Sequence, residues 1–191
     1  MTAACQKLRA GQKLALMTTD PFLAPDGRAR ALARRLIDTA RHASLGTLDP
    51  DSGAPLVTRI ALQADPDGAP VALLSGLAAH ARALALDPRA GLMVAGDGSG
   101  DPMAQPRLSV LARAVVAAPD PARRDRWLAR DPRAQLYIDL PDFCFWRLEP
   151  LSGLLNAGFG RAYRLAAADM LKPPAAEEAV EGDDSPAGPS P

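Results

Sequence analysis

The first strong pattern of apolar positions covers residues 28–43, "RARALARRLIDTARHA". Asp26 is placed to cap the N-terminus of a helix there, and His42 falls at its C-terminal end, where capping or solvation explains a histidine. The spacing predicts an amphipathic helix that lies on a core. Its apolar positions are Ala29, Leu32, Ala33, Leu36, Ile37 and Ala40.

After residue 43 the spacing becomes alternating. The runs "ASLGTL", "LVTRIALQA" and "VALLS" are separated by the turn signals "DPDSGAP" and "DPDGAP", which is typical of an antiparallel meander. Val57, Arg59, Ala61 and Gln63 fall on one face of the second run, so Arg59 places a charge in an apolar strand. Since burying an unpaired guanidinium is costly, Arg59 must reach solvent, an acidic residue or an anionic ligand. Simple surface exposure is the plainer explanation.

The rest of the chain alternates strands with two helices. "LAAHARALAL" predicts a short helix, "GLMVAG" and "RLSVLARAVVAA" predict strands, and "PDPARRDRWLARDPRAQLYI" predicts a helix capped by Asp120 with Pro121 at its first position. "FCFWRLEPL" and "SGLLNAGFGRAYRL" predict two strands that meet at Gly153. Six or seven strands with three helices favour a small closed antiparallel barrel, because the early turns are too short for the crossover helices of a parallel sheet.

Composition narrows the class of protein. With 191 residues, 48% of them hydrophobic, the chain can close one sizeable core. A formal net charge of +0 gives no overall field for nucleic acid or an anionic membrane, so neither partner is expected. The sequence has neither the roughly 20-residue apolar run of a membrane span nor the apolar core of a secretion signal. We therefore expect a cytoplasmic protein.

The two ends differ from the middle. Residues 1–27 form an N-terminal extension with two candidate starts, Met1 and Met17. Residues 28–168 form the predicted domain. Residues 169–191 are rich in proline and acidic side chains, and we expect a disordered tail there. The two cysteines lie far apart, in the extension and in the domain, so no structural disulfide is expected.

One stretch, "VALLSGLAAHARALALDPRAGLMV" at residues 71–94, places Ser75, His80 and Arg82 between a strand and a helix. Two interpretations stay open. The first is a polar corner between two core elements. The second is a phosphate pocket, because free amides at a helix N-terminus and a guanidinium both favour a dianion.

Four blocks of the sequence resemble a known family. They are "ARRLIDTARHASLGTLDPDSGAPLVTRIAL", "LLSGLAAHARALALDPRAGLMV", "DPMAQPRLSVLARA" and "NAGFGRAYRL". In order and spacing, over about residues 28–166, they resemble the FMN-binding split-barrel superfamily. Within it they resemble the HugZ-type haem-utilisation branch, which is pyridoxamine-phosphate-oxidase-like. The resemblance implies a mainly β (α+β) fold, a six- to seven-stranded antiparallel split β-barrel with about three flanking helices.

The resemblance also implies a homodimer that holds two FMN molecules in clefts between its subunits. Three residues would follow the flavin ring, three would face its phosphate, and two would come from the partner subunit. The last two are explained equally well as an ordinary entry from loop to strand. In that order, the residues are Arg59, Ile60 and Leu62; Ser75, His80 and Arg82; and Gln105 and Arg107.

The closing region departs from the family pattern. True pyridoxamine-phosphate oxidases end in an arginine-leucine-histidine segment, whereas this chain reads "RLEPLSGLL" and "GFGRAYRL", and no histidine follows His80. We therefore expect neither efficient oxidation of pyridoxamine phosphate nor haem ligation through a C-terminal histidine.

Three functions remain. The first is an FMN-dependent oxidoreductase with an unknown small-molecule substrate, in which the cofactor carries the redox chemistry. The alternative is a non-catalytic flavin- or haem-binding protein involved in haem or iron utilisation. The third is a structural dimer without a cofactor. No catalytic residue is assigned, and no residues have the spacing of metal ligands.

Overall fold

The computed structural model describes residues 20–96, 98–158 and 160–172. Most of the predicted extension and tail, including Cys5 and Met17, lies outside the described residues. No helix in the described ranges is long and apolar enough to cross a membrane. In chain order the elements are α1 (Gly27–Thr39), β1 (His42–Leu48), β2 (Pro55–Ala61), β3 (Gln63–Ala64), β4 (Pro70–Ser75), α2 (Ala79–Leu86), β5 (Arg89–Ala95), β6 (Arg107–Val116), α3 (Pro121–Arg130), the 3-10 helix η2 (Pro132–Leu136), β7 (Phe143–Asn156), β8 (Ala162–Ala166) and α4 (Ala167–Met170).

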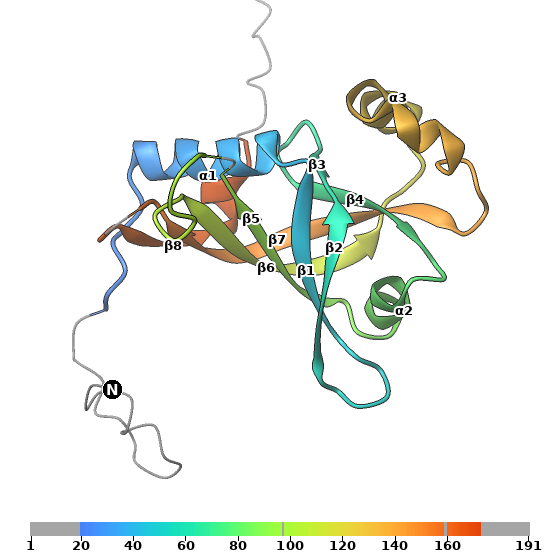
Figure 1. Cartoon of the computed structure of the whole chain (residues 1–191), viewed down its shortest axis with the longest axis horizontal. Helices are drawn as coiled ribbons and strands as arrows, with labels where there is room; N and C mark the ends of the chain where they lie inside the picture. Colours follow the sequence, from blue (N-terminus) through green and yellow to red (C-terminus); the bar gives the residue numbers. More distant parts are fainter. Residues whose placement is uncertain (1–19, 97, 159, 173–191) are drawn as a thin grey trace, which may run out of the picture.

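The strands form one antiparallel sheet in the order β2-β1-β5-β6-β7-β4-β3, with β8 paired to β7. β2 and β3 stand at opposite ends of this order, yet only Leu62 separates them along the chain. The sheet therefore curls until its two edges meet at one segment (Figure 1). This confirms the mainly β antiparallel split barrel expected from the sequence.

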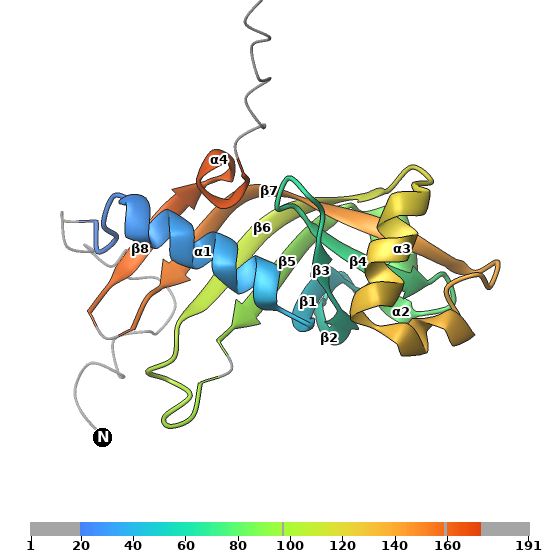
Figure 2. The same cartoon turned by 90° about the horizontal axis from the view of Figure 1, so that it is seen from above.

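The core lies inside the curled sheet and beneath α1. Alternate residues of each strand point inward, and Leu45, Leu92, Val110 and Leu148 are among the buried ones. α1 lies along the sheet (Figure 2) and buries its apolar stripe against the same core. A second, smaller cluster around Trp127 fills the space between α3 and β4.

Both predicted helix caps are confirmed. The Asp26 carboxylate accepts the Ala29 N–H at 2.7 Å, and the Asp120 carboxylate accepts the Ala122 N–H at 2.9 Å. The predicted end of α1 was wrong, because the helix stops at Thr39 and His42 is the first residue of β1. The alternation that marks β1 begins inside the stretch assigned to the helix, so the strand pattern overrides the last helical positions.

The predicted break at Gly153 was also wrong. β7 runs through Gly153, which pairs with Val110 of β6 on one side and Leu165 of β8 on the other. A Cβ at this position would lie 2.8 Å from the Met170 sulfur. The glycine therefore makes room for the buried Met170 of α4 rather than ending a strand.

Candidate functional site

The site is built at the end of β4, where a tight turn leads into α2. The Ser75 hydroxyl donates to Asp142 Oδ2 at 2.5 Å, and the Gly76 N–H donates to the Asp142 carbonyl at 2.6 Å. The Leu77 N–H donates to Ser75 Oγ at 3.1 Å. Since its hydroxyl proton is already used, Ser75 holds the turn in shape. Asp142 lies 67 residues further along the chain, and nothing local in the sequence pairs it with Ser75.

The N-terminus of α2 has free backbone donors. Ala78 stands at the N-cap and provides no side-chain acceptor, and the first helical bond runs from the Arg82 N–H to the Ala78 carbonyl at 3.1 Å. The N–H groups of Ala79, His80 and Ala81 therefore have no acceptor within the helix. Such a helix end favours an oxyanion.

Two side chains beside this helix end add to its chemistry. His80 is half-buried, and burial lowers its pKa below the ordinary value. Its imidazole is therefore neutral at pH 7 and can donate one hydrogen bond without contributing charge. Arg82, two residues further along the helix, is exposed and supplies the positive charge.

Along β2 the three predicted ring contacts separate. Arg59 is exposed on the outer face, opposite Ser44 of β1, as its alternation predicts. The side chains of Ile60 and Leu62 are buried in the core. Only backbone groups at these two positions can meet a ligand. β2 stands at the edge of the described sheet, where backbone groups are available, but the Leu62 N–H is not one of them, because it donates to the Arg41 carbonyl at 3.1 Å.

Gln105 and Arg107 lie elsewhere. Gln105 donates to the Gly98 carbonyl within the loop between β5 and β6, and Arg107, at the start of β6, donates to the Met103 carbonyl at 3.0 Å. Figures 1 and 2 place this loop at the opposite end of the molecule from α2. A single chain therefore does not bring these two residues to the helix end, and their approach from a partner subunit stays a prediction.

The outer face of the sheet carries large apolar side chains. Val57 is 68% exposed, Leu111 63% and Leu151 61%, with Met93 and Leu154 also exposed on the same face. Cross-strand pairing sets them side by side, because Leu111 stands between Gly91 of β5 and Ser152 of β7. These five residues, Val57, Met93, Leu111, Leu151 and Leu154, are called the outer apolar face below.

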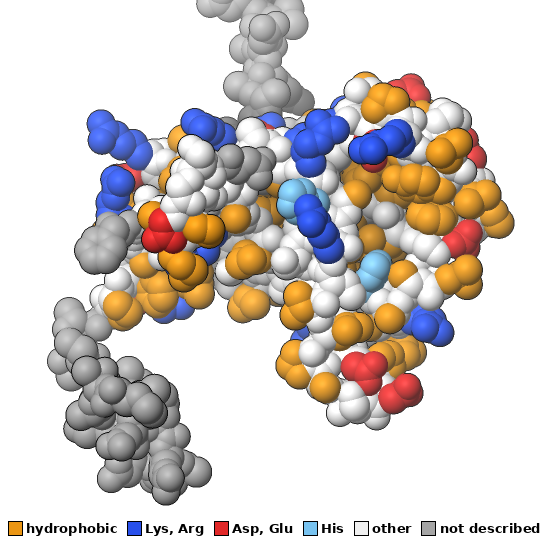
Figure 3. Space-filling model, in the orientation of Figure 1, with side chains coloured by type: hydrophobic (Ala, Val, Ile, Leu, Met, Phe, Trp, Pro, Cys, Tyr) orange, Lys and Arg blue, Asp and Glu red, His pale blue; other side chains and the backbone are white. Residues whose placement is uncertain are grey.

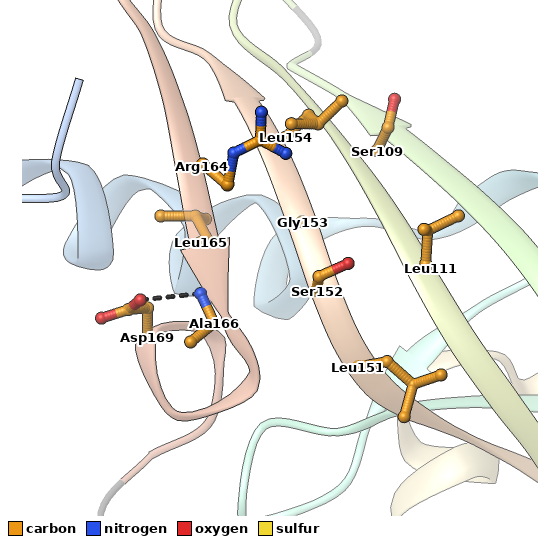
Figure 4. Close-up of a pocket in the computed structure, with 10 residues that line it drawn as sticks. All are labelled: Ser109, Leu111, Leu151, Ser152, Gly153, Leu154, Arg164, Leu165, Ala166 and Asp169. Atoms are coloured by element: carbon orange, nitrogen blue, oxygen red, sulfur yellow. Dashed lines mark hydrogen bonds between the residues drawn. The ribbon is translucent and has the colours of Figure 1, made fainter. Parts of the chain in front are cut away.

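The outer apolar face is hollowed. A cavity of about 560 Å³ lies between β6, β7 and β8, with Leu111, Leu151 and Leu154 in its lining and Arg164 among the few polar side chains there (Figure 4). A second hollow of about 380 Å³ adjoins it over Gly91 and Met93. An apolar hollow of this size suits a flat ring or the side chains of another protein.

Known proteins with similar sequences or structures bear on the site described above. No protein-family model matches the chain. The chloroplastic heme oxygenase HOZ of Arabidopsis thaliana is 31% identical over 113 residues, which are 56% of this chain and 35% of that protein. The chain thus spans about a third of the length of that relative.

Solved structures match more of the chain. One is 67% identical with a TM-score of 0.76 and covers 79% of this chain and 100% of its own. The heme binding protein from Mycobacterium smegmatis is 28% identical with a TM-score of 0.69, over 78% of this chain and 61% of that one. A protein of the pyridoxinephosphate oxidase family from Clostridium acetobutylicum, 13% identical with a TM-score of 0.57 over 74% of this chain and 96% of that one, shares the fold.

Proposed function

The chain belongs to the pyridoxamine-phosphate-oxidase-like split-barrel superfamily, in its HugZ-type haem-utilisation branch, and on that premise we propose that it binds FMN and acts as an FMN-dependent oxidoreductase. The observation that carries the proposal is the uncapped N-terminus of α2, with Arg82 beside it. A terminal phosphate monoester fits three free amides, a neutral imidazole donor and a guanidinium. When bound, FMN supplies hydride or electron transfer.

The protein's own residues divide the work of holding the cofactor. The amides of Ala79, His80 and Ala81, together with Arg82, take the phosphate, while Arg59 and the edge backbone of β2 follow the ring. Ser75 acts through the turn that it holds with Asp142. His80, whose pKa is lowered by burial in the ligand-free chain, donates a hydrogen bond that orients the phosphate.

The cleft needs a second copy of the chain. The outer apolar face supports a two-fold homodimer, since a large exposed apolar patch on a small domain marks an interface. Gln105 and Arg107 of one copy would then approach the cofactor on the other. Obligate homodimers with apolar interfaces bury roughly 2,000 Å² or more.

The test is a titration of the purified full chain with FMN, FAD and riboflavin, followed by flavin fluorescence. FMN should bind most tightly, because the helix end is open to a terminal monoester. NAD(P)H added to the FMN complex should then bleach the flavin absorbance. Failure of FMN to bind would reject the proposal, and binding without reduction by either nucleotide would leave a flavin-binding protein that does not accept their electrons.

Haem is the second candidate ligand, favoured by a different observation. Two relatives above 25% identity are, by name, a non-canonical heme oxygenase and a heme binding protein. Haem also combines a flat apolar ring with acidic groups, so the apolar hollow between β6, β7 and β8, with Arg164 in its lining, suits it. A haemin titration run beside the FMN titration compares the two ligands directly, and the tighter one identifies the physiological ring.

A further inference from the structure

A polar pocket of about 270 Å³ lies away from the outer apolar face, where the end of α1, the junction of β2 and β3, and the end of α3 meet. Figure 3 shows Lys and Arg side chains gathered around a histidine on the face between α1 and α3. Three arginines and a histidine face a single carboxylate, that of Asp131. The polar side chains that line the pocket are Arg41, His42, Gln63, Arg130, Asp131 and Arg133.

Two of these arginines are already held in place by carbonyl groups. Arg41 Nη2 donates to the Arg130 carbonyl at 2.6 Å. Arg130 Nη1 donates to the Asp38 carbonyl at 2.7 Å, and its Nη2 donates to the Ala40 carbonyl at 3.0 Å. The two guanidiniums thus tie the C-terminal ends of α1 and α3 together, and several N–H donors of each remain free.

Carboxylates neutralise only part of the positive charge of the pocket. Over the described ranges, neither Arg41 nor Arg130 forms an ion pair, and the carboxylate nearest Arg133 is that of Asp131 at 3.8 Å. The C-terminal dipoles of the two helices offset part of the charge of Arg41 and Arg130. They do not account for Arg133, whose side chain is 92% exposed at the rim.

One buried polar group in the pocket wall also lacks a partner. The Trp127 side chain is 2% exposed, and its indole Nε1 has no hydrogen-bond acceptor among the described residues. The backbone of Trp127 is fixed at the same time, because Gln63 Nε2 donates to its carbonyl at 3.0 Å. A rigid wall beside two orientated guanidiniums, those of Arg41 and Arg130, which have no carboxylate partner among the described residues, is the arrangement expected of a preorganised oxyanion site.

We propose that this pocket binds the oxyanion of a small organic acid or phosphate ester, with Arg41 and Arg130 as the fixed donors and Arg133 closing over the anion from the rim. The volume of about 270 Å³ exceeds that of the anionic group alone, so an organic part enters with it. Leu62 of the proposed flavin strand also lines the pocket. The proposal itself needs no flavin, because α2 contributes no lining residue.

Isothermal titration of the full chain with inorganic phosphate and with acetate tests the proposal. Arg133→Gln, which removes an exposed side chain, should weaken binding about tenfold, as loss of one charge-assisted hydrogen bond does. Arg41→Gln should weaken it at least as much. Arg28→Gln removes the same charge from an exposed position at the start of α1 and should leave the affinity unchanged. The more tightly bound anion identifies the ligand class.

The indole N–H resonance of Trp127, assigned with Trp127→Phe, gives a local readout that separates this pocket from the α2 helix end. It should shift on titration in the wild type and in Arg28→Gln, and much less in Arg133→Gln. Equal binding in wild type and Arg133→Gln, or no binding tighter than about 10 mM, would overturn the proposal. Loss of FMN binding would leave this result unchanged.

Discussion

The charged cluster around Asp65 and the outer apolar face differ in one respect: the cluster buries paired charges within one chain, and the face leaves apolar side chains exposed. Asp65 is 5% exposed and accepts from Arg123 at 3.0 Å, from Arg147 at 3.2 Å and from Arg126 at 3.4 Å. Arg147 also pairs with Asp67. The outer apolar face has large side chains in the open instead. The cluster is complete within one chain, whereas the face needs a partner to become buried.

The largest expected effect is a loss of stability when the charged cluster around Asp65 is broken. Asp65→Ala leaves three arginines around an empty buried position, and removal of one partner of a buried ion pair costs about 3–5 kcal/mol. Urea unfolding should show this loss as a lower midpoint. Asp87→Ala is the control, because it removes the carboxylate of the exposed Asp87–Arg89 pair. Equal destabilisation by the two variants would show that Asp65 is no more important than a surface charge.

The next largest expected effect is on dimerisation through the outer apolar face. Leu111→Arg places a charge in the middle of the outer apolar face without disturbing the core, so it should convert a dimer into a folded monomer. Light scattering at micromolar concentration should show half the mass. Leu136→Arg, which changes a still more exposed leucine on η2, should leave the dimer intact. A wild-type monomer would contradict the two-copy cleft as well as this prediction.

The contrast also explains how far sequence reasoning reached. The alternation of β1, β2 and β6 and the two aspartate caps are local signals, and they predicted an antiparallel barrel with flanking helices, while the split form was implied by the family resemblance. Alternation also put Arg59 on the same face as Val57, and it left open whether Arg59 meets solvent, an acidic residue or an anionic ligand. The network around Asp65 joins β3, α3 and β7, and the Ser75–Asp142 bond joins positions 67 residues apart. No local pattern encodes such pairs.

The sequence could not show whether residues from distant segments come together at one site. The loop between β5 and β6, which ends at Arg107, lies far from α2 in one chain, so only a partner subunit can bring Gln105 and Arg107 to the site. The polar pocket was missed as well, since Arg41 and Arg130 lie on different helical ends. Clustered arginines far apart in sequence become visible only in three dimensions.

A smaller effect, on FMN affinity, is expected from a change at the N-terminus of α2. Arg82→Ala removes one charge-assisted hydrogen bond of about 1.5–3 kcal/mol, so FMN affinity should fall by roughly ten- to a hundredfold. Riboflavin has no phosphate, and its affinity should not change. Arg35→Ala, at an exposed position on α1, is the matched control. Unchanged FMN affinity in a folded Arg82→Ala variant would show that the phosphate binds elsewhere.

The last predictions expect no activity. They test whether this protein carries out the reactions of other family members. Oxidation of pyridoxamine phosphate requires cations for a second phosphate, for which the closing strands offered Arg147, Arg161 and Arg164. Arg147 is committed to Asp65 and Asp67. Arg164 lies over the Phe22 ring at 4.7 Å and 3.8 Å from Asp20. We therefore expect turnover of pyridoxamine phosphate to stay near background.

Haem iron is the sharper form of the same question, because its axial ligand is normally His, Cys, Met or Tyr. His42 lines the polar pocket, away from the outer apolar face, and His80 faces the proposed phosphate position in the first turn of α2. We expect neither to ligate iron, so any haemin absorbance should be the same in wild type, His42→Ala and His80→Ala. A sharp Soret band with one-to-one stoichiometry that disappears only in His80→Ala would show that haem, rather than FMN, binds at the N-terminus of α2.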